Sequence, residues 1–94
     1  MSVVWMRRAV AEHRSLVAYI ATYSPRAAVQ QGDRIVEAAN ALADNPERGR
    51  PGRVAGTREL VVPRTNHIVV YRKAASGRIE ILRVLHGAQR WPPV

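Results

Sequence analysis

The sequence has 94 residues, of which 47% are hydrophobic, and it carries a formal net charge of +8 at pH 7. A chain of this length forms one domain with a modest core, so we expect a single domain over residues 1–94. It contains no cysteine, which excludes disulfides and thiolate metal sites. No apolar run reaches the roughly 20 residues of a membrane-spanning helix. We therefore expect a soluble, cytoplasmic protein without a membrane partner.

The positive charge lies in the C-terminal half. Residues 1–47 contain five arginines and five acidic residues, whereas residues 48–94 contain nine arginines and Lys73 against Glu59 and Glu80, so ten minus two gives the whole +8. Such asymmetry favours an anionic partner, which could be nucleic acid, a nucleic-acid machine or an acidic protein. Solubility, or the arginine bias of a GC-rich genome, explains the same composition.

The N-terminal half predicts a short strand and two helices. Val3–Trp5 is a run of strand-forming residues, and apolar residues then recur at helical spacing from Arg7 to Tyr23. Ser24 and Pro25 suit the N-cap and first position of a second helix. That helix should close at Asn45, because the following proline disfavours helix there. The two helices should form an αα-hairpin.

The C-terminal half predicts a basic loop followed by three strands. Residues 47–56 (ERGRPGRVAG) combine glycine, proline and arginine and read as a loop. Strand-like runs follow at residues 57–62, 67–73 and 78–85, with connections short enough for hairpins. The predicted fold class is therefore α+β, with a helical hairpin packed on a small antiparallel β-sheet in the order β-α-α-β-β-β.

Both faces of the predicted sheet are apolar. In the last strand, strict alternation places Leu82 and Val84 on one face. The other face would carry Ile79, Ile81, Arg83 and Leu85. A freely solvated face does not need so many apolar residues, so we expect the second face to be covered by the tail, by the basic loop or by a partner chain.

The sequence offers few groups for catalysis. The three histidines lack metal-ligand spacing, and we expect no metal or cofactor. A metal-free ribonuclease needs an acid or base and cations, for which His86, Arg83 and Arg64 are the candidates. A structural interpretation instead pairs Arg83 with Glu80 or Glu59 and makes Trp91 a hydrophobic peg for the tail.

Four segments carry a resemblance to a known family: residues 9–21, residues 45–62 (NPERGRPGRVAGTRELVV), residues 67–72 (HIVVYR) and residues 81–92 (ILRVLHGAQRWP). Together they resemble the ParE/RelE superfamily of toxins from bacterial type II toxin-antitoxin systems. The resemblance implies a microbial-ribonuclease-like fold. It also implies a cognate ParD-like antitoxin, acidic where it wraps the toxin, with which the chain would form a hetero-oligomer.

The resemblance also bears on the target. RelE-like toxins cut messenger RNA in the ribosome, whereas ParE-like toxins poison DNA gyrase without a demonstrated nuclease centre. The segment VLHGAQRWP resembles the ParE branch, and the sheet has only Lys73 where the RelE pattern has several lysines. The resemblance thus favours a gyrase-inhibiting toxin that is not an enzyme. A ribosome-dependent mRNA endoribonuclease and a nontoxic relative are the alternatives. The expected target-binding residues are Arg50, Arg53, Arg58, Arg64, Arg83, His86, Arg90 and Trp91.

Overall fold

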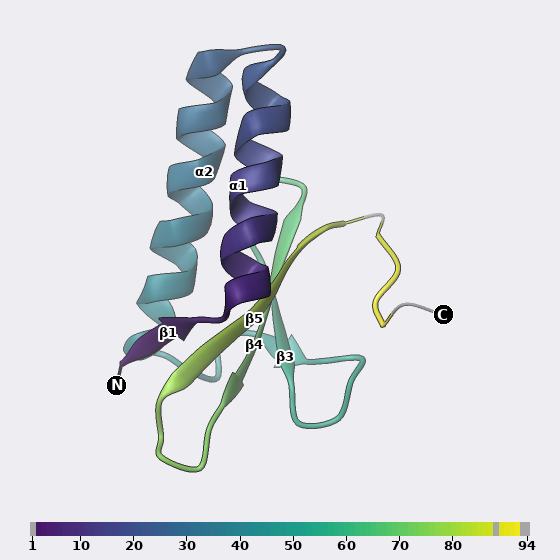
Figure 1. Ribbon diagram of the computed structural model, residues 1–94. Coiled ribbons are helices and arrows are strands. Elements are labelled where there is room, and N and C mark those ends of the chain that lie inside the picture. Colours follow the sequence, from purple (N-terminus) through teal and green to yellow (C-terminus); the bar gives the residue numbers. More distant parts are fainter. Residues whose placement is uncertain (1, 88, 93–94) are drawn as a thin grey trace.

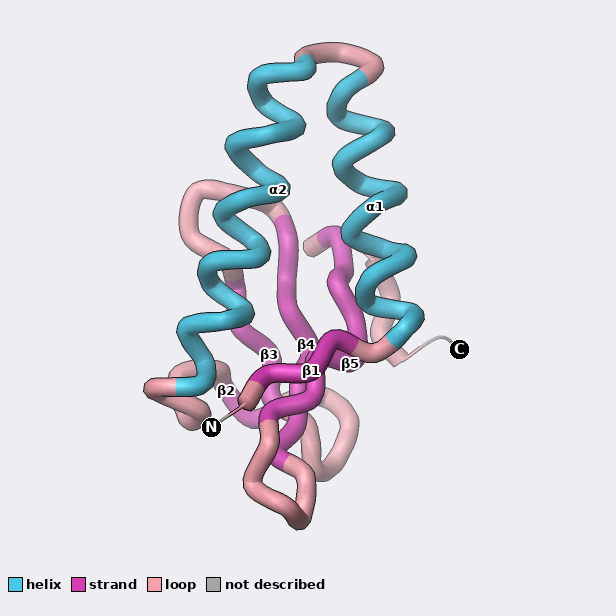
Figure 2. The backbone as a smooth tube through the Cα atoms, turned by 60° about the vertical axis from the view of Figure 1, so that its left-hand side comes forward, coloured by secondary structure: helices cyan, strands magenta, loops and turns pink. Residues whose placement is uncertain are grey.

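A computed structural model of the chain describes residues 2–87 and 89–92, so Ala88 of the HGAQRWP segment lies outside the described residues. Figure 1 shows the two helices as an antiparallel hairpin beside the sheet, and Figure 2 shows both on the same face of it. The predicted α+β class is confirmed. The elements are β1 (Val3–Trp5), α1 (Arg7–Ala21), α2 (Pro25–Asn40), a 3-10 turn η1 (Ala41–Ala43), β2 (Arg50–Pro51), β3 (Arg58–Val61), β4 (His67–Lys73) and β5 (Ile79–His86).

The sheet has five strands in the order β1-β5-β4-β3-β2. Strands β2 to β5 pair antiparallel, as predicted, but β1 pairs parallel with β5, so the sheet is mixed. Parallel neighbours need a long connection, which the hairpin and the other strands provide. The two-residue strand β2 falls inside the predicted basic loop and pairs with β3. The predicted sheet was correct in its central meander. At one edge the predicted strand β1 is present but pairs parallel instead of antiparallel, and at the other edge β2 was not predicted.

The helical hairpin depends on one cap and one glycine. The Ser24 hydroxyl accepts a hydrogen bond from the backbone N–H of Ala27 at 3.1 Å, which fixes the start of α2 as predicted. Further along α2, a β-carbon on Gly32 would lie 2.9 Å from Cγ2 of Val17 in α1. The Gly32 carbonyl also lies 3.0 Å from Nε2 of His13. Gly32 therefore lets the two helices approach closely.

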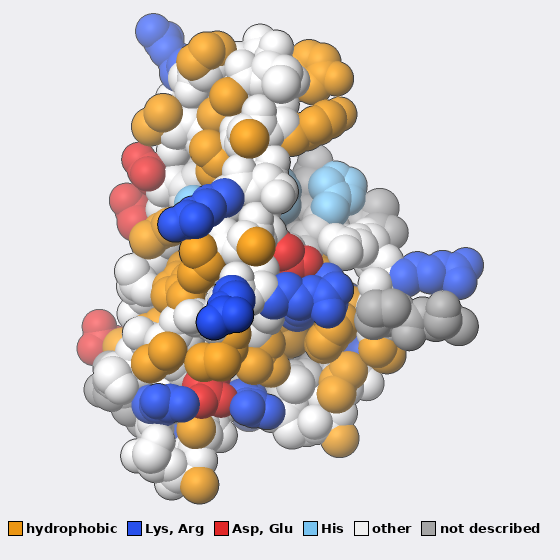
Figure 3. Space-filling model, viewed as in Figure 1, with side chains coloured by type: hydrophobic (Ala, Val, Ile, Leu, Met, Phe, Trp, Pro, Cys, Tyr) orange, Lys and Arg blue, Asp and Glu red, His pale blue; other side chains and the backbone are white. Residues whose placement is uncertain are grey.

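The main core lies between the hairpin and the sheet. Beyond this contact the hairpin continues, and Tyr19, Tyr23 and Val29 are exposed near its tip, where Figure 3 shows hydrophobic side chains on the surface. Tyr23 had been predicted on the apolar stripe of the first helix; it is exposed because the hairpin extends past the sheet. The core residues are Ala9, Ile35, Ala39, Leu42, Leu60, Val62, Val69, Tyr71, Ile79, Ile81 and Val84.

A register shift in β5 corrects the predicted faces. Val70 pairs with Arg83 and Tyr71 pairs with Ile81, so one residue of β5 is extra. Ile81 and Val84 consequently belong to the same core. On the far face, Leu85 packs with Ile68 and Val70, and Leu82 and Trp91 cover this second cluster. The strict alternation predicted for β5 was wrong. Three covers were expected for the second face of the sheet, and the tail is one of them.

Candidate functional site: an arginine-rich surface and a groove beside the last strand

Arg83 is buried and bound to α1. Its side chain donates three hydrogen bonds to the Glu12 carboxylate, the shortest from Nη2 to Oε2 at 2.7 Å. Glu12 also accepts the backbone N–H of Val84 at 3.0 Å. The sequence had suggested Glu80 or Glu59 as the partner of Arg83, and this was wrong. The register shift lies beside Arg83, and bulges of this kind re-aim side chains.

The aromatic tail closes over the same arginine. The guanidinium carbon of Arg83 lies 4.9 Å from the centroid of the Trp91 ring, within cation–π range. Trp91 also packs against the far-face cluster. It is thus the hydrophobic peg that the sequence predicted, and it stacks on a cation as well. Its neighbour Arg90 is exposed.

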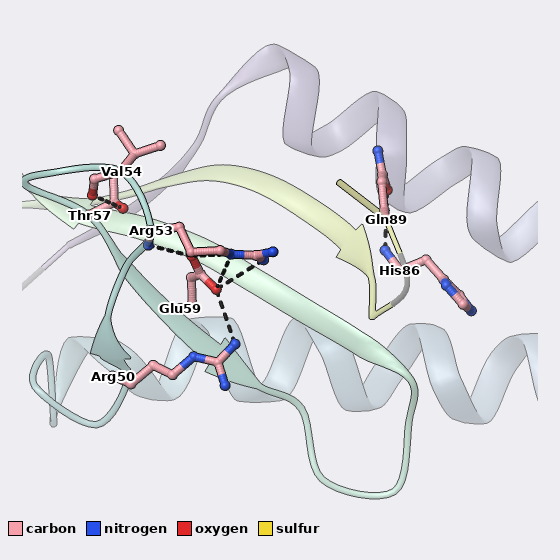
Figure 4. A network of polar contacts seen from close by, with 7 residues as sticks. All are labelled: Arg50, Arg53, Val54, Thr57, Glu59, His86 and Gln89. Carbon is pink, nitrogen blue, oxygen red and sulfur yellow. Dashed lines mark hydrogen bonds and ion pairs between the residues drawn. The ribbon is translucent and has the colours of Figure 1, made fainter. Parts of the chain in front are cut away.

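A second arginine cluster surrounds a buried carboxylate at the β2–β3 edge. Glu59 of β3 is 1% exposed and accepts hydrogen bonds from the Arg50 side chain at 3.1 Å and from the Arg53 backbone N–H at 2.8 Å (Figure 4). Burial pushes the pKa of Glu59 upward, but the hydrogen bonds from Arg53 and Arg50 outweigh it and hold that pKa below its ordinary value. The side chains of Arg50 and Arg53 keep 56% and 43% of their surface exposed.

Arg58 and Tyr71 hold the loop that precedes β2. Arg58 donates to the Gly49 carbonyl at 2.7 Å. The Tyr71 hydroxyl donates to the Pro46 carbonyl at 2.7 Å and accepts the Gly49 N–H at 2.9 Å. A β-carbon on Gly49 would lie 2.7 Å from that hydroxyl, so the close approach requires glycine. Burial raises the pKa of Tyr71, which keeps the hydroxyl a donor.

Arg64 lies apart from both clusters, at the turn between β3 and β4. Its backbone adopts a φ of 62°, a conformation uncommon for residues other than glycine. Its carbonyl accepts a hydrogen bond from Arg34 of α2 at 3.3 Å. Together with Arg34 and Arg48, Arg64 lines a hollow of about 260 Å³.

His86 lies in a different place, a groove of about 580 Å³ between α1 and the end of β5. Of the three residues proposed for nuclease chemistry, His86 lines this groove, Arg83 is bound by Glu12 and Arg64 lines the hollow near α2. The fold therefore does not bring these three residues together in one described hollow. The groove is lined by Arg8, Ala11, Glu12, Ser15, Leu16, Tyr19, His67, Val84, His86 and Gln89.

Glu12 and His67 are site residues that the sequence reasoning missed. Glu12 is the only acidic residue in the first 32 positions. An arginine flanked by apolar strand residues needs a carboxylate when it is buried, so this lone helical acid was a usable signal. His67, by contrast, became notable only through its strand pairing with His86, which no local pattern indicates.

Two kinds of feature are absent from the described residues. No helix among residues 2–87 and 89–92 is long and apolar enough to cross a membrane. Within the same residues, no three histidine or acidic side chains gather as a metal site would require.

The described residues thus form a helical hairpin on a mixed five-stranded sheet, with arginines along one edge of the sheet and Trp91 packed over the last strand. Residues 3–91 match the family described as "ParE toxin of type II toxin-antitoxin system, parDE". The chain therefore belongs to the ParE toxin family, and it is a toxin of the type II toxin-antitoxin class.

Individual relatives agree with this family. The chain is 43% identical over 90 residues to "Putative toxin Y4kP" of Sinorhizobium fredii, covering 96% of this chain and 92% of that protein. It is 41% identical over 87 residues to "Toxin RelE2" of Caulobacter vibrioides, covering 93% and 96% respectively. Among solved structures, the chromosomal ParDE system of P. aeruginosa contains a chain with a TM-score of 0.79 and 30% identity, covering 92% of this chain and 95% of that one.

Proposed function

We propose that this protein is a cytoplasmic toxin that binds DNA gyrase and blocks DNA strand passage, and that a cognate ParD-like antitoxin neutralises it. The observation that carries the proposal is the match to the ParE family over residues 3–91. Gyrase poisoning is what the resemblance to the ParE branch implies for this chain. The proposed toxin acts by binding and has no nuclease chemistry of its own.

The geometry of the candidate cations supports binding over catalysis. A metal-free ribonuclease needs a cation free to stabilise the charge that develops on phosphate. Arg83, which the sequence offered for this task, is 4% exposed and gives three hydrogen bonds to Glu12. We therefore assign Arg83 to holding β5 on α1.

The exposed arginines supply the proposed contact surface. Arg50 and Arg53 are half exposed, and each retains donors beyond those that reach Glu59. Arg90 projects from the tail, which Trp91 holds in place. Arg58 and Tyr71 hold the loop that precedes β2 in position through their hydrogen bonds. This surface is cationic, as an interface with an acidic protein or a protein–DNA complex would require.

The antitoxin partner rests on the same comparisons. The similar P. aeruginosa structure is that of a ParDE system. A net charge of +8 on this chain favours an acidic neutralising partner. The exposed apolar residues at the hairpin tip, Tyr19, Tyr23 and Val29, add surface that a partner could cover.

A supercoiling assay tests the proposal. Purified protein added to gyrase, relaxed plasmid and ATP should abolish supercoiling at stoichiometric amounts, and premixing with the cognate antitoxin should restore it. Expression without the antitoxin should give filamentous cells with an induced DNA-damage response. Normal supercoiling at about a tenfold molar excess of this protein over gyrase would rule out gyrase as the target.

Ribosome-dependent mRNA cleavage is the second candidate, and one observation favours it. His67 and His86 both line the groove beside α1, and two imidazoles can serve as acid and base in metal-free cleavage. The relative from Caulobacter vibrioides also bears the name RelE2. Cleaved transcripts and rapid translation arrest after expression, with normal supercoiling, would select this alternative.

A further inference from the structure

His67 and His86 face each other where β4 begins and β5 ends. The two residues are direct partners in the antiparallel register, and their ring centroids lie 5.9 Å apart with the planes at 88°. His67 is 7% exposed, whereas His86 is exposed. One imidazole of the pair is thus buried, and its nearest strand partner is another titratable ring.

Among the described residues, the buried imidazole has no acceptor for a second proton. Nδ1 of His67 is buried, and no described residue forms a hydrogen bond with it. A neutral ring tolerates this, but an imidazolium would place a charged N–H donor in the interior. Buried groups of this kind resist protonation until the structure opens.

The charged and titratable groups near His67 do not stabilise its protonated ring. From α1, Arg8 and Glu12 line the same groove, and Tyr19 lies there as a neutral phenol. Glu12 is the one carboxylate among the residues that line the groove, and it already binds Arg83 and the Val84 N–H. The nearby imidazole of His86 would repel a positive ring.

Three effects lower the pKa of His67. Burial lowers its pKa most, and the nearby imidazoles of His86 and His13 lower it further. At a pH below 6.5, the ordinary pKa of histidine, a His67 ring exposed to water would bind a proton that the buried ring does not bind. Acid therefore favours any state in which His67 reaches water.

The segment that would open is the C-terminal tail with the end of the β4–β5 pair. Beyond His86, the Gly87 N–H donates to the Asn66 carbonyl at 2.6 Å, and the Gln89 side chain accepts the His86 N–H at 3.3 Å (Figure 4). The tail then places Trp91 on the far-face cluster. Among the described residues, this segment is held by these two hydrogen bonds, by the Gln89 N–H bond to the His86 carbonyl at 2.9 Å and by the packing of Trp91. Gly87, Gln89 and Arg90 are exposed, and exposed segments of this kind open locally.

We propose that the His67–His86 pair is an acid-sensitive latch that keeps the end of β4–β5 closed at neutral pH and releases the C-terminal tail on acidification. Release uncovers the apolar cluster around Ile68, Val70 and Leu85. It also changes the groove beside α1, because both imidazoles line it. The latch is a property of the fold and does not depend on gyrase or the antitoxin.

Nuclear magnetic resonance on the full chain tests the latch. As the pH falls from about 7.5 to about 5, the His67 ring should titrate below its ordinary value while the protection of the Gly87 amide against hydrogen exchange falls about tenfold or more. The indole N–H signal of Trp91 should shift with the same midpoint. Titration of His67 with unchanged Gly87 protection would overturn the proposal.

Two substitutions locate the effect. The variant His67→Phe, which keeps a ring of apolar character in the buried position, should retain Gly87 protection at about pH 5. The comparison variant His13→Gln removes the weaker of the two imidazole effects on the pKa of His67, so its acid response should persist with a midpoint close to that of the wild type. Loss of the acid response in His13→Gln but not in His67→Phe would refute the latch, and if His67→Phe does not fold, the wild-type titration decides.

Discussion

Arg83 and Glu12 lie 71 positions apart in the sequence and form one ion pair in which the guanidinium meets both carboxylate oxygens, with Nη2 and Oε2 at 2.7 Å. The pair connects the last strand to the first helix. Because the side chain of Arg83 is 5% exposed and that of Glu12 is 20% exposed, water screens it little. The pair therefore acts as a link between the two ends of the chain.

The first prediction concerns Arg83→Ala. This change leaves the Glu12 carboxylate partly buried and without its cation, so we expect the free energy of unfolding to fall by about 3 kcal/mol. Urea denaturation measures it. The control Arg78→Ala removes a half-exposed arginine from Glu80, which keeps Arg72, and should cost much less. A wild-type urea midpoint for Arg83→Ala would contradict this structural role.

The second prediction concerns Tyr71→Phe. The change removes the hydroxyl that binds Pro46 and Gly49 and leaves two backbone groups without their partner, which should cost about 1–2 kcal/mol of stability. Thermal unfolding and exchange of the Gly49 amide measure the effect. The exposed Tyr19 offers a matched control, since Tyr19→Phe should leave the unfolding curve unchanged. Equal effects of the two changes would show that the loop does not depend on Tyr71.

The third prediction concerns stability in acid. Arg72 first, and then Arg78, hold the pKa of Glu80 below its ordinary value, and Arg53 and Arg50 do the same for Glu59 against its burial. Lowered carboxyl pKa values in the folded state stabilise it above the unfolded value of 4.5, and this stability is lost as the pH falls further. Urea midpoints between about pH 6 and about pH 3 should therefore decline most steeply below about 4.5. In Glu59→Gln this decline should be shallower, and an unchanged slope would contradict the assignment.

How much of this fold could be predicted depends on the range of the interactions. Ser24, the helical stripe and the strand runs are local patterns, and each predicted its element. The parallel pairing of β1 with β5 joins residues more than 70 positions apart, as in Val3 with Ile79, and periodicity has no information on such a pair. The two-residue β2 is too short for a periodic signal.

The site was less predictable than the fold for a related reason. One extra residue at the register shift turned Val84 toward the main core, which the two-residue period cannot anticipate. The partner of Arg83 was therefore sought on the strands, where Glu59 and Glu80 lie. Those two acids instead bind arginines of their own neighbourhood, namely Arg50, Arg53, Arg72 and Arg78.

The fourth prediction concerns the tail. Trp91 packs on the far-face cluster and lies over Arg83, so Trp91→Ala should lower the free energy of unfolding by about 2 kcal/mol, less than for a fully buried tryptophan. It should also increase binding of a hydrophobic dye, because the cluster loses its cover. Val61→Ala, at an apolar residue that is 51% exposed, is the control and should change stability by less than about 0.5 kcal/mol. Unchanged dye binding in Trp91→Ala would mean that the tail does not cover the cluster.

The fifth prediction separates the proposed gyrase contact from general positive charge. Arg90 is exposed beside Trp91 in the tail, so Arg90→Glu should leave the urea midpoint unchanged. If this residue contacts gyrase, reversing its charge should raise the concentration for half-inhibition of supercoiling about tenfold, because like charges oppose at the interface. Arg26→Glu makes the same change in net charge at an exposed arginine on the first turn of α2, far along the hairpin from β5, and should leave inhibition near the wild-type level. Equal losses in both variants would show that gyrase responds only to the net charge of the toxin, and the tail would then have no specific part in the contact.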